Sequence, residues 1–248
     1  MVTRLNSSPI LDADNAEWDS RQRLAGAYRI LDHLGWTETI YGHITVRVPG
    51  PNTHFLINPY GLRYDEVQAS NLIKIDLDGN VVGKSNYPVN RAGFVIHSAI
   101  HSAREDAHCV LHTHTVAGMA VAAQRFGLLP VSMPATGFHG RIAYHDYEGP
   151  SLNLDERKRL IADLGDKKVM ILRTHGLLTC GNTLEEAFIL MFRLQRACEI
   201  QIAAQAGGTA LVTPPIEILN RAVSLTDKFL TAHDGQPTGK LEFDSYLR

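Results

Sequence analysis

The sequence is poor in cysteine, in net charge and in long apolar runs, and each shortage argues against a class of protein. The three cysteines have no CxxC spacing, which argues against a disulfide scaffold and predicts reduced thiols in a cytoplasmic protein. Lysine and arginine number 24 against 26 acidic residues, without a basic run, so neither nucleic acid nor an anionic membrane is expected as a partner. No apolar stretch approaches the roughly 20 residues of a membrane span. The N-terminus has no apolar signal core.

The composition favours one soluble α/β domain. With 248 residues, 44% of them hydrophobic, the chain is long enough to bury a large core. We expect a single domain over residues 1–248, with tails at 1–14 and 234–248, and the two aromatics of the second tail predict that it docks on the domain. Histidine is abundant, with 12 residues, and seven of them lie between His97 and His145.

Hydrophobic periodicity predicts an alternation of helices and strands. Helices are expected over residues 15–34, 90–103, 115–124, 154–164 and 184–206, with Thr183 as an N-cap, and a last helix of about four turns follows Pro214-Pro215. Strands are expected over 41–48, 55–58, 72–77, 107–112 and 169–172. The stretch 127–149 is predicted to be an irregular active-site loop because it is rich in glycine, proline, histidine and tyrosine.

Two of the predicted strands end in histidine. The apolar run 107–111 leads into His112-Thr-His114, and side chains two residues apart on a strand share a face. A second apolar run, 169–172, leads to His175-Gly176. Three imidazoles brought to one point suit a divalent metal. From the spacing alone, hydrogen-bonded core histidines are as good an interpretation.

The chain resembles the class II aldolase/adducin family from about Trp18 to Gly208, most of all the adducin head domain and its bacterial relatives. The segments that carry the resemblance are His112-Thr-His114, Arg173-Thr-His175-Gly176, Gly181-Asn-Thr-Leu-Glu-Glu-Ala-Phe, Ile40-Tyr-Gly-His-Ile-Thr-Val-Arg and Asn90-Arg-Ala-Gly-Phe-Val-Ile-His. The resemblance implies a three-layer α/β/α sandwich around a central, mostly antiparallel mixed sheet. It also implies a homotetramer with active sites at subunit interfaces and a divalent ion, usually zinc, on three histidines. The matching positions here are His112, His114 and His175.

The sequence departs from the sugar-phosphate aldolases of that family at two sets of positions. Their acidic residue, four positions before a helical histidine, aligns with Gly93 when that histidine is His97, so the usual acid/base is missing. The three residue pairs with which those aldolases bind phosphate are also changed. Gly42-His43 stands at the first, Tyr60-Gly61 at the second, and the third lies within Val89-Asn90-Arg91. A phosphorylated sugar is therefore not the expected substrate.

The remaining residues suggest a lyase whose proton donor has changed. A Lewis-acidic ion stabilises the enolate left by C–C cleavage, which serves both aldol cleavage and decarboxylation. Decarboxylation tolerates the loss of the acid better, since it needs only a proton donor to finish. His97 and His101, at i and i+4, and Tyr144 are the candidate donors, and structural roles for all three stay open.

Three hypotheses follow for the chain as a whole. The first is a metal-dependent lyase, an aldolase or decarboxylase acting on a non-phosphorylated hydroxy or oxo acid. The second is a non-catalytic adducin-like interaction module. The third is an iron-dependent oxygenase that uses the same three histidines. Imidazole suits zinc, manganese and iron, so the ligands alone do not choose the metal.

Overall fold

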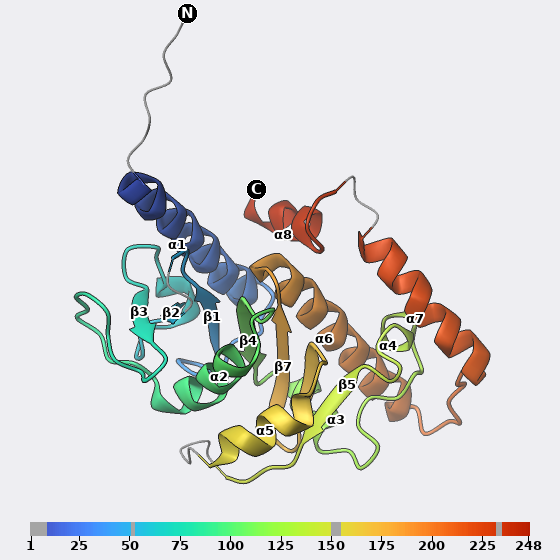
Figure 1. Ribbon diagram of the computed structural model, residues 1–248. Helices are drawn as coiled ribbons and strands as arrows, with labels where there is room; N and C mark the ends of the chain where they lie inside the picture. Colours follow the sequence, from blue (N-terminus) through green and yellow to red (C-terminus); the bar gives the residue numbers. More distant parts are fainter. Residues whose placement is uncertain (1–8, 51–52, 150–154, 232–234) are drawn as a thin grey trace, which may run out of the picture.

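A seven-stranded sheet forms the centre of the protein in the computed structural model, which describes residues 9–50, 53–149, 155–231 and 235–248 (Figure 1). The strand order is β3-β2-β1-β4-β7-β6-β5. Neighbouring strands are antiparallel except β5 and β6, which are parallel. The strands are β1 (His43–Arg47), β2 (His54–Ile57), β3 (Ile73–Asp76), β4 (Cys109–Thr113), β5 (Ile142–His145), β6 (Val169–Leu172) and β7 (Gly176–Gly181).

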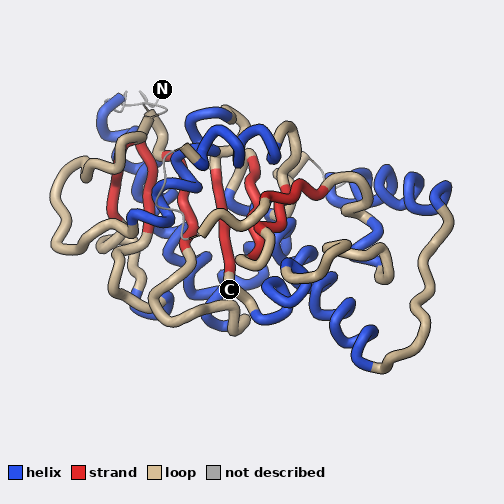
Figure 2. The backbone as a smooth tube through the Cα atoms, turned by 90° about the horizontal axis from the view of Figure 1, so that it is seen from below, coloured by secondary structure: helices blue, strands red, loops and turns tan. Residues whose placement is uncertain are grey.

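Helices cover both faces of the sheet, as the view along its edge shows (Figure 2). On one face α1 packs on β1, while α3 and α6 pack on β7. On the other face α2 contacts β4 and α5 contacts β5. The three-layer α/β/α sandwich around a mixed sheet is therefore confirmed. The helices are α1 (Pro9–His33), the 3-10 turn η1 (Tyr64–Glu66), α2 (Arg91–Ala103), α3 (Val116–Ala122), α4 (Met133–Thr136), α5 (Glu156–Leu164), α6 (Leu184–Ala206), α7 (Ile216–Thr231) and α8 (Lys240–Leu247).

Strand β4 shows how the sequence sorts side chains between the two layers. Cys109 and Leu111 are buried in the core under α1 and α6, whereas Val110 is buried with residues of α2 and α5. This alternation follows from the two-residue period of a strand. By the same period, His112 lies on the face that α2 covers.

The turn between β6 and β7 places His175 beside the end of β4. Strand β7 lies between β4 and β6, and its first residue, Gly176, is paired with Leu172 of β6. The turn includes Thr174 with a φ of 52°, a conformation that is uncommon for a β-branched residue. The end of β4 and the start of its neighbour β7 therefore bring the histidines together.

Several boundaries differ from the sequence-based expectation. The first helix begins at Pro9, so only residues 1–8 of the expected tail 1–14 lie outside the described residues. The expected loop 127–149 contains α4 and β5, and Tyr144 is therefore on a strand. Strand β7, flanked by glycines, was not predicted. Strands β5 and β7 are stabilised by pairing with β6, which no local pattern reveals.

The C-terminal residues 240–247 form a docked helix rather than a tail. Phe243 of α8 is fully buried and packs edge-on against Phe188 of α6, with ring centroids 5.3 Å apart, as its aromatic character predicted. Helix α6 begins as expected, because the Thr183 side chain accepts a hydrogen bond from the backbone N–H of Glu186. Among the described residues, no helix has the length and apolar character needed to cross a membrane.

Candidate metal centre

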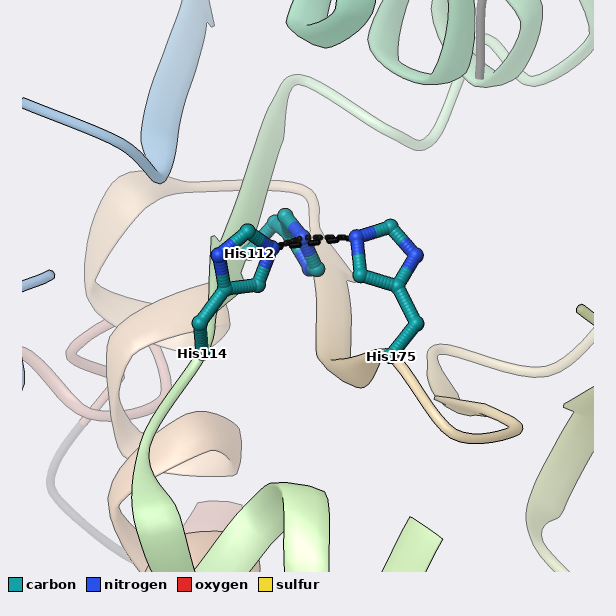
Figure 3. A group of neighbouring side chains, drawn as sticks. All are labelled: His112, His114 and His175. Atoms are coloured by element: carbon teal, nitrogen blue, oxygen red, sulfur yellow. Dashed lines mark hydrogen bonds between the residues drawn. The ribbon is translucent and has the colours of Figure 1, made fainter. Parts of the chain in front are cut away.

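The side chains of His112, His114 and His175 converge on one point (Figure 3). Their Nε2 atoms are 2.7 Å apart for His112 and His114, 3.0 Å for His114 and His175, and 3.3 Å for His112 and His175. His112 is on β4, His114 follows that strand, and His175 precedes β7. The structure thus brings together all three residues that the sequence singled out as metal ligands.

Hydrogen bonds at the far side of two rings determine which nitrogen carries the proton. The Nδ1 atom of His112 lies 2.8 Å from the carbonyl oxygen of Leu177, which can only accept, so Nδ1 is the donor. The Nδ1 atom of His114 lies 2.5 Å from Oε2 of Glu38 and donates to that carboxylate. In the neutral rings the Nε2 atoms therefore carry lone pairs.

The geometry and charge state of this cluster fit a divalent cation. Burial holds the pKa of His175 at about 4 and the pKa of His112 well below its usual value, so both rings are neutral ligands at pH 7. Lone pairs on Nε2 atoms about 3 Å apart repel unless a cation lies between them. Tetrahedral zinc with Zn–N distances of about 2.0–2.1 Å places its nitrogens about 3.3 Å apart, close to the separations found here.

Gly176 allows the two chain segments to approach each other closely. A Cβ atom at this position would lie 2.4 Å from the carbonyl oxygen of Thr113 and 3.3 Å from the rings of His112 and His114. The backbone after His175 therefore touches the end of β4, and only glycine fits between them.

A second group of buried histidines lies beside the metal centre, between β1 and α2. His43 faces His112 across the β1–β4 pair, and their ring centroids are 5.6 Å apart. Thr45, the next residue of β1 on the same face as His43, forms hydrogen bonds of 2.7 Å with both His97 and His101 of α2. His97 and His101, two of the three predicted proton donors, thus lie in the layer next to the metal ligands. We call these four residues, His43, Thr45, His97 and His101, the polar seam.

Tyr144, the third predicted proton donor, packs elsewhere. Its hydroxyl accepts a hydrogen bond of 3.1 Å from the backbone N–H of Leu128. The guanidinium of Arg173 lies over its ring, 4.2 Å from the centroid. The contacts of Tyr144 in the described structure do not include the three histidines.

Glu38 and His43 are site residues that the sequence did not identify as such. Glu38 lies before β1 in Trp36-Thr-Glu-Thr, and nothing in this stretch marks a partner of a distant histidine. His43 had a usable signal, because it precedes Thr45 by two residues on a predicted strand and so shares its face. Only the register between β1 and β4 reveals that this face adjoins His112.

Comparison with known proteins gives consistent matches. Residues 22–202 match the family model described as Class II Aldolase and Adducin N-terminal domain. The crystal structure of an aldolase II superfamily protein from Pseudomonas syringae has a TM-score of 0.88 and 48% identity, with 98% of this chain and 96% of that chain covered. The L-fuculose 1-phosphate aldolase from Glaciozyma antarctica PI12 has a TM-score of 0.77 and 27% identity, with 94% and 97% covered. Alpha-adducin of Rattus norvegicus is 48% identical over 212 residues, which are 84% of this chain and 29% of that protein.

Proposed function

Because the chain belongs to the class II aldolase and adducin N-terminal domain family, we propose that it is a divalent-metal-dependent carbon–carbon lyase. We propose that it acts on a non-phosphorylated hydroxy or oxo acid, as an aldolase or a decarboxylase. The observation that carries this proposal is the convergence of three Nε2 atoms, from His112, His114 and His175, of which the first two carry lone pairs. A scaffold has no evident need to bury such a mutually repulsive set.

Some residues of the site would bind the metal, and others orient the histidines that bind it. The ion, when bound, supplies Lewis-acid chemistry that withdraws electrons as the C–C bond breaks. The Leu177 carbonyl holds His112 in the correct tautomer, and the Glu38 carboxylate does the same for His114. Glu38 also places a carboxylate beside the three imidazoles, which favours a cation. We propose zinc as the ion.

The surroundings of the site support a substrate without phosphate. His43 and Gly42 stand where related aldolases use a phosphate-binding pair. Both ring nitrogens of His43 are buried, and the ring packs against Gly93 rather than turning toward solvent. A phosphate would need exposed N–H and O–H donors at this position.

The three proposed proton-transfer residues differ in how their polar atoms are engaged. His101 uses both ring nitrogens, with Nδ1 2.8 Å from the carbonyl oxygen of Ala107 and Nε2 bonded to Thr45. The hydroxyl of Tyr144 is held by the Leu128 N–H. His97 keeps Nε2 without a partner in the described structure. We therefore propose that His97 is the residue of this group that acts at the site, through the neighbouring ring of His43.

Self-association into a tetramer remains part of the proposal. Helix α7 projects from the body of the domain (Figure 1), and several of its apolar side chains are exposed, among them Ile218, Leu225 and Phe229. Exposed apolar side chains on one helix are typical of a surface that another subunit covers. Multi-angle light scattering tests this directly.

Elemental analysis of the purified protein beside a His112→Ala variant tests the proposed function. We expect about one equivalent of zinc or manganese per chain, lost in the variant and retained in His33→Ala, which replaces an exposed histidine at the end of α1 that is not one of the three clustered histidines. A metal-loaded protein is then screened with hydroxy and oxo acids for released carbon dioxide or aldehyde. Iron with oxygen-dependent turnover would favour an oxygenase. A folded protein that binds none of these metals would contradict the lyase and favour an interaction module.

A further inference from the structure

The polar seam is a chain of hydrogen bonds whose direction is determined at one end. Burial holds the pKa of His101 at about 3, and it places the pKa of His97 well below its usual value, so both rings are neutral at pH 7. A neutral imidazole has one N–H and one lone pair. Each hydrogen bond in the seam therefore restricts the next.

The starting point is the carbonyl oxygen of Ala107, which can only accept. His101 Nδ1, 2.8 Å away, must therefore be its donor, and His101 Nε2 carries the lone pair. Thr45 donates its single hydroxyl proton to that Nε2, 2.7 Å away. The Thr45 oxygen then accepts from Nδ1 of His97, also at 2.7 Å. By elimination, Nε2 of His97 is a lone pair.

The ring that carries this lone pair packs beside the ring of His43. The His97 and His43 ring centroids are 4.2 Å apart, and Nε2 of His97 has no hydrogen-bond partner within the described ranges. Neither ring nitrogen of His43 has one there. A buried polar atom left unpaired is destabilising, so three of them side by side favour a state in which they are paired.

We propose that His43 donates its N–H to Nε2 of His97 and offers its other nitrogen, as a hydrogen-bond acceptor, to a hydroxyl group of the ligand held at the metal centre. His43 stands between the two, because its ring contacts His97 on one side and the metal ligand His112 on the other. This proposal rests on the proposed metal centre and makes His43 a specificity-determining residue for hydroxylated acids.

The tautomers of the seam are measurable without any activity. Long-range ¹H–¹⁵N spectra of zinc-loaded protein carrying ¹⁵N-histidine identify the protonated nitrogen of each ring. We expect both His97 and His101 to be protonated at Nδ1. A Thr45→Val variant keeps the shape but loses the hydroxyl, so His97 should shift toward the Nε2 tautomer, whereas Thr45→Ser should keep the wild-type pattern. His97 protonated at Nε2 in the wild-type protein would overturn the proposal.

Ligand selectivity tests the role of His43 itself. The probes are glycolate, which has a free hydroxyl, and its methyl ether methoxyacetate, titrated calorimetrically into zinc-loaded protein. We expect His43→Ala to weaken glycolate binding about two- to tenfold, the worth of one hydrogen bond, with methoxyacetate affected less than twofold. His43→Phe keeps a ring of similar size and should lose the same selectivity, which separates the hydrogen bond from packing.

The two proposals fail in different ways. The role of His43 would be overturned if wild type and His43→Ala preferred glycolate over methoxyacetate to the same extent. It would also be overturned if the zinc-loaded wild type did not bind glycolate. Either result would leave the metal centre in place. A wild-type protein that does not retain zinc would instead contradict the proposed function. In that case the spectra of the metal-free protein still test the direction of the seam.

Discussion

The imidazole ring of His43 fills the space into which a side chain on Gly93 would project. A Cβ atom on Gly93 would lie 2.6 Å from Cε1 of His43 and 2.7 Å from both of its nitrogens. Gly93 is also the position at which the family resemblance predicts the missing acidic residue. In this chain Gly93 of α2 and His43 of β1 therefore pack directly against each other beside His112. A larger residue at position 93 would displace the imidazole ring.

The first prediction concerns Gly93→Ala. The added methyl group must push His43 out of its position, because the ring lies under 3.0 Å away, and overpacking of this kind costs about 1–3 kcal/mol. Urea unfolding of the metal-free protein measures the loss in the free energy of unfolding. The matched control is Gly207→Ala at the end of α6, where a Cβ meets nothing nearer than 3.9 Å. Equal stabilities for the two variants would contradict the packing described here.

The second prediction concerns Glu38→Gln. The change removes the negative charge that holds Nδ1 of His114, and partners of this kind typically contribute 10–100-fold to metal affinity. Zinc affinity, measured by competition with a chromophoric chelator, should fall within that range while the fold is kept. Glu217→Gln, at an exposed carboxylate of α7, should leave the affinity unchanged. An unchanged affinity in Glu38→Gln would show that this carboxylate does not support the site.

The third prediction concerns acid stability. His43 and His101 have pKa values of about 3 in the folded protein, because burial disfavours their charged forms, against about 6.5 in an unfolded chain. Between these values the unfolded chain binds more protons, so stability is fully present above pH 6.5 and decreases as the pH falls. Each ring should lower the free energy of unfolding by about 1.4 kcal/mol between pH 7.5 and 5.5.

This effect is measured by urea unfolding of metal-free protein at the two pH values. His101→Gln, which removes one of the buried titrating rings, should show a smaller pH dependence than wild type, whatever its stability at pH 7.5. Replacement of the exposed His33 by glutamine is the control and should keep the wild-type dependence. The same dependence in all three proteins would contradict the assignment to buried histidines.

The fourth prediction concerns the docking of α8. Phe243 is fully buried against Phe188, and replacing a buried phenylalanine by alanine typically costs 3–5 kcal/mol. Phe243→Ala should therefore lower the midpoint of thermal unfolding clearly. Leu241→Ala, two residues earlier on the same helix but 53% exposed, should change it little. A small effect of Phe243→Ala would show that α8 contributes little to the stability of the domain.

Much of this architecture follows from local sequence patterns. The long helix 184–206 and its Thr183 N-cap were predicted because helical periodicity extends over six turns and a threonine precedes it. The strand that ends at residue 172 was predicted from its apolar run. Strands β5 and β7 were missed, since four to six residues next to glycines carry too little periodicity to be recognised.

The cluster of three histidines was also predictable from the sequence. His112 and His114 share a face because a strand repeats every two residues, and His175 ends a second apolar run. The sequence therefore determined which residues can hold a metal, and the tertiary structure decided what surrounds them. Glu38 and His43 reach the site only through the fold and the register between β1 and β4, and the Ala107 carbonyl orients the seam only through contact with α2. Such contacts join residues far apart in the chain, and no local pattern encodes them.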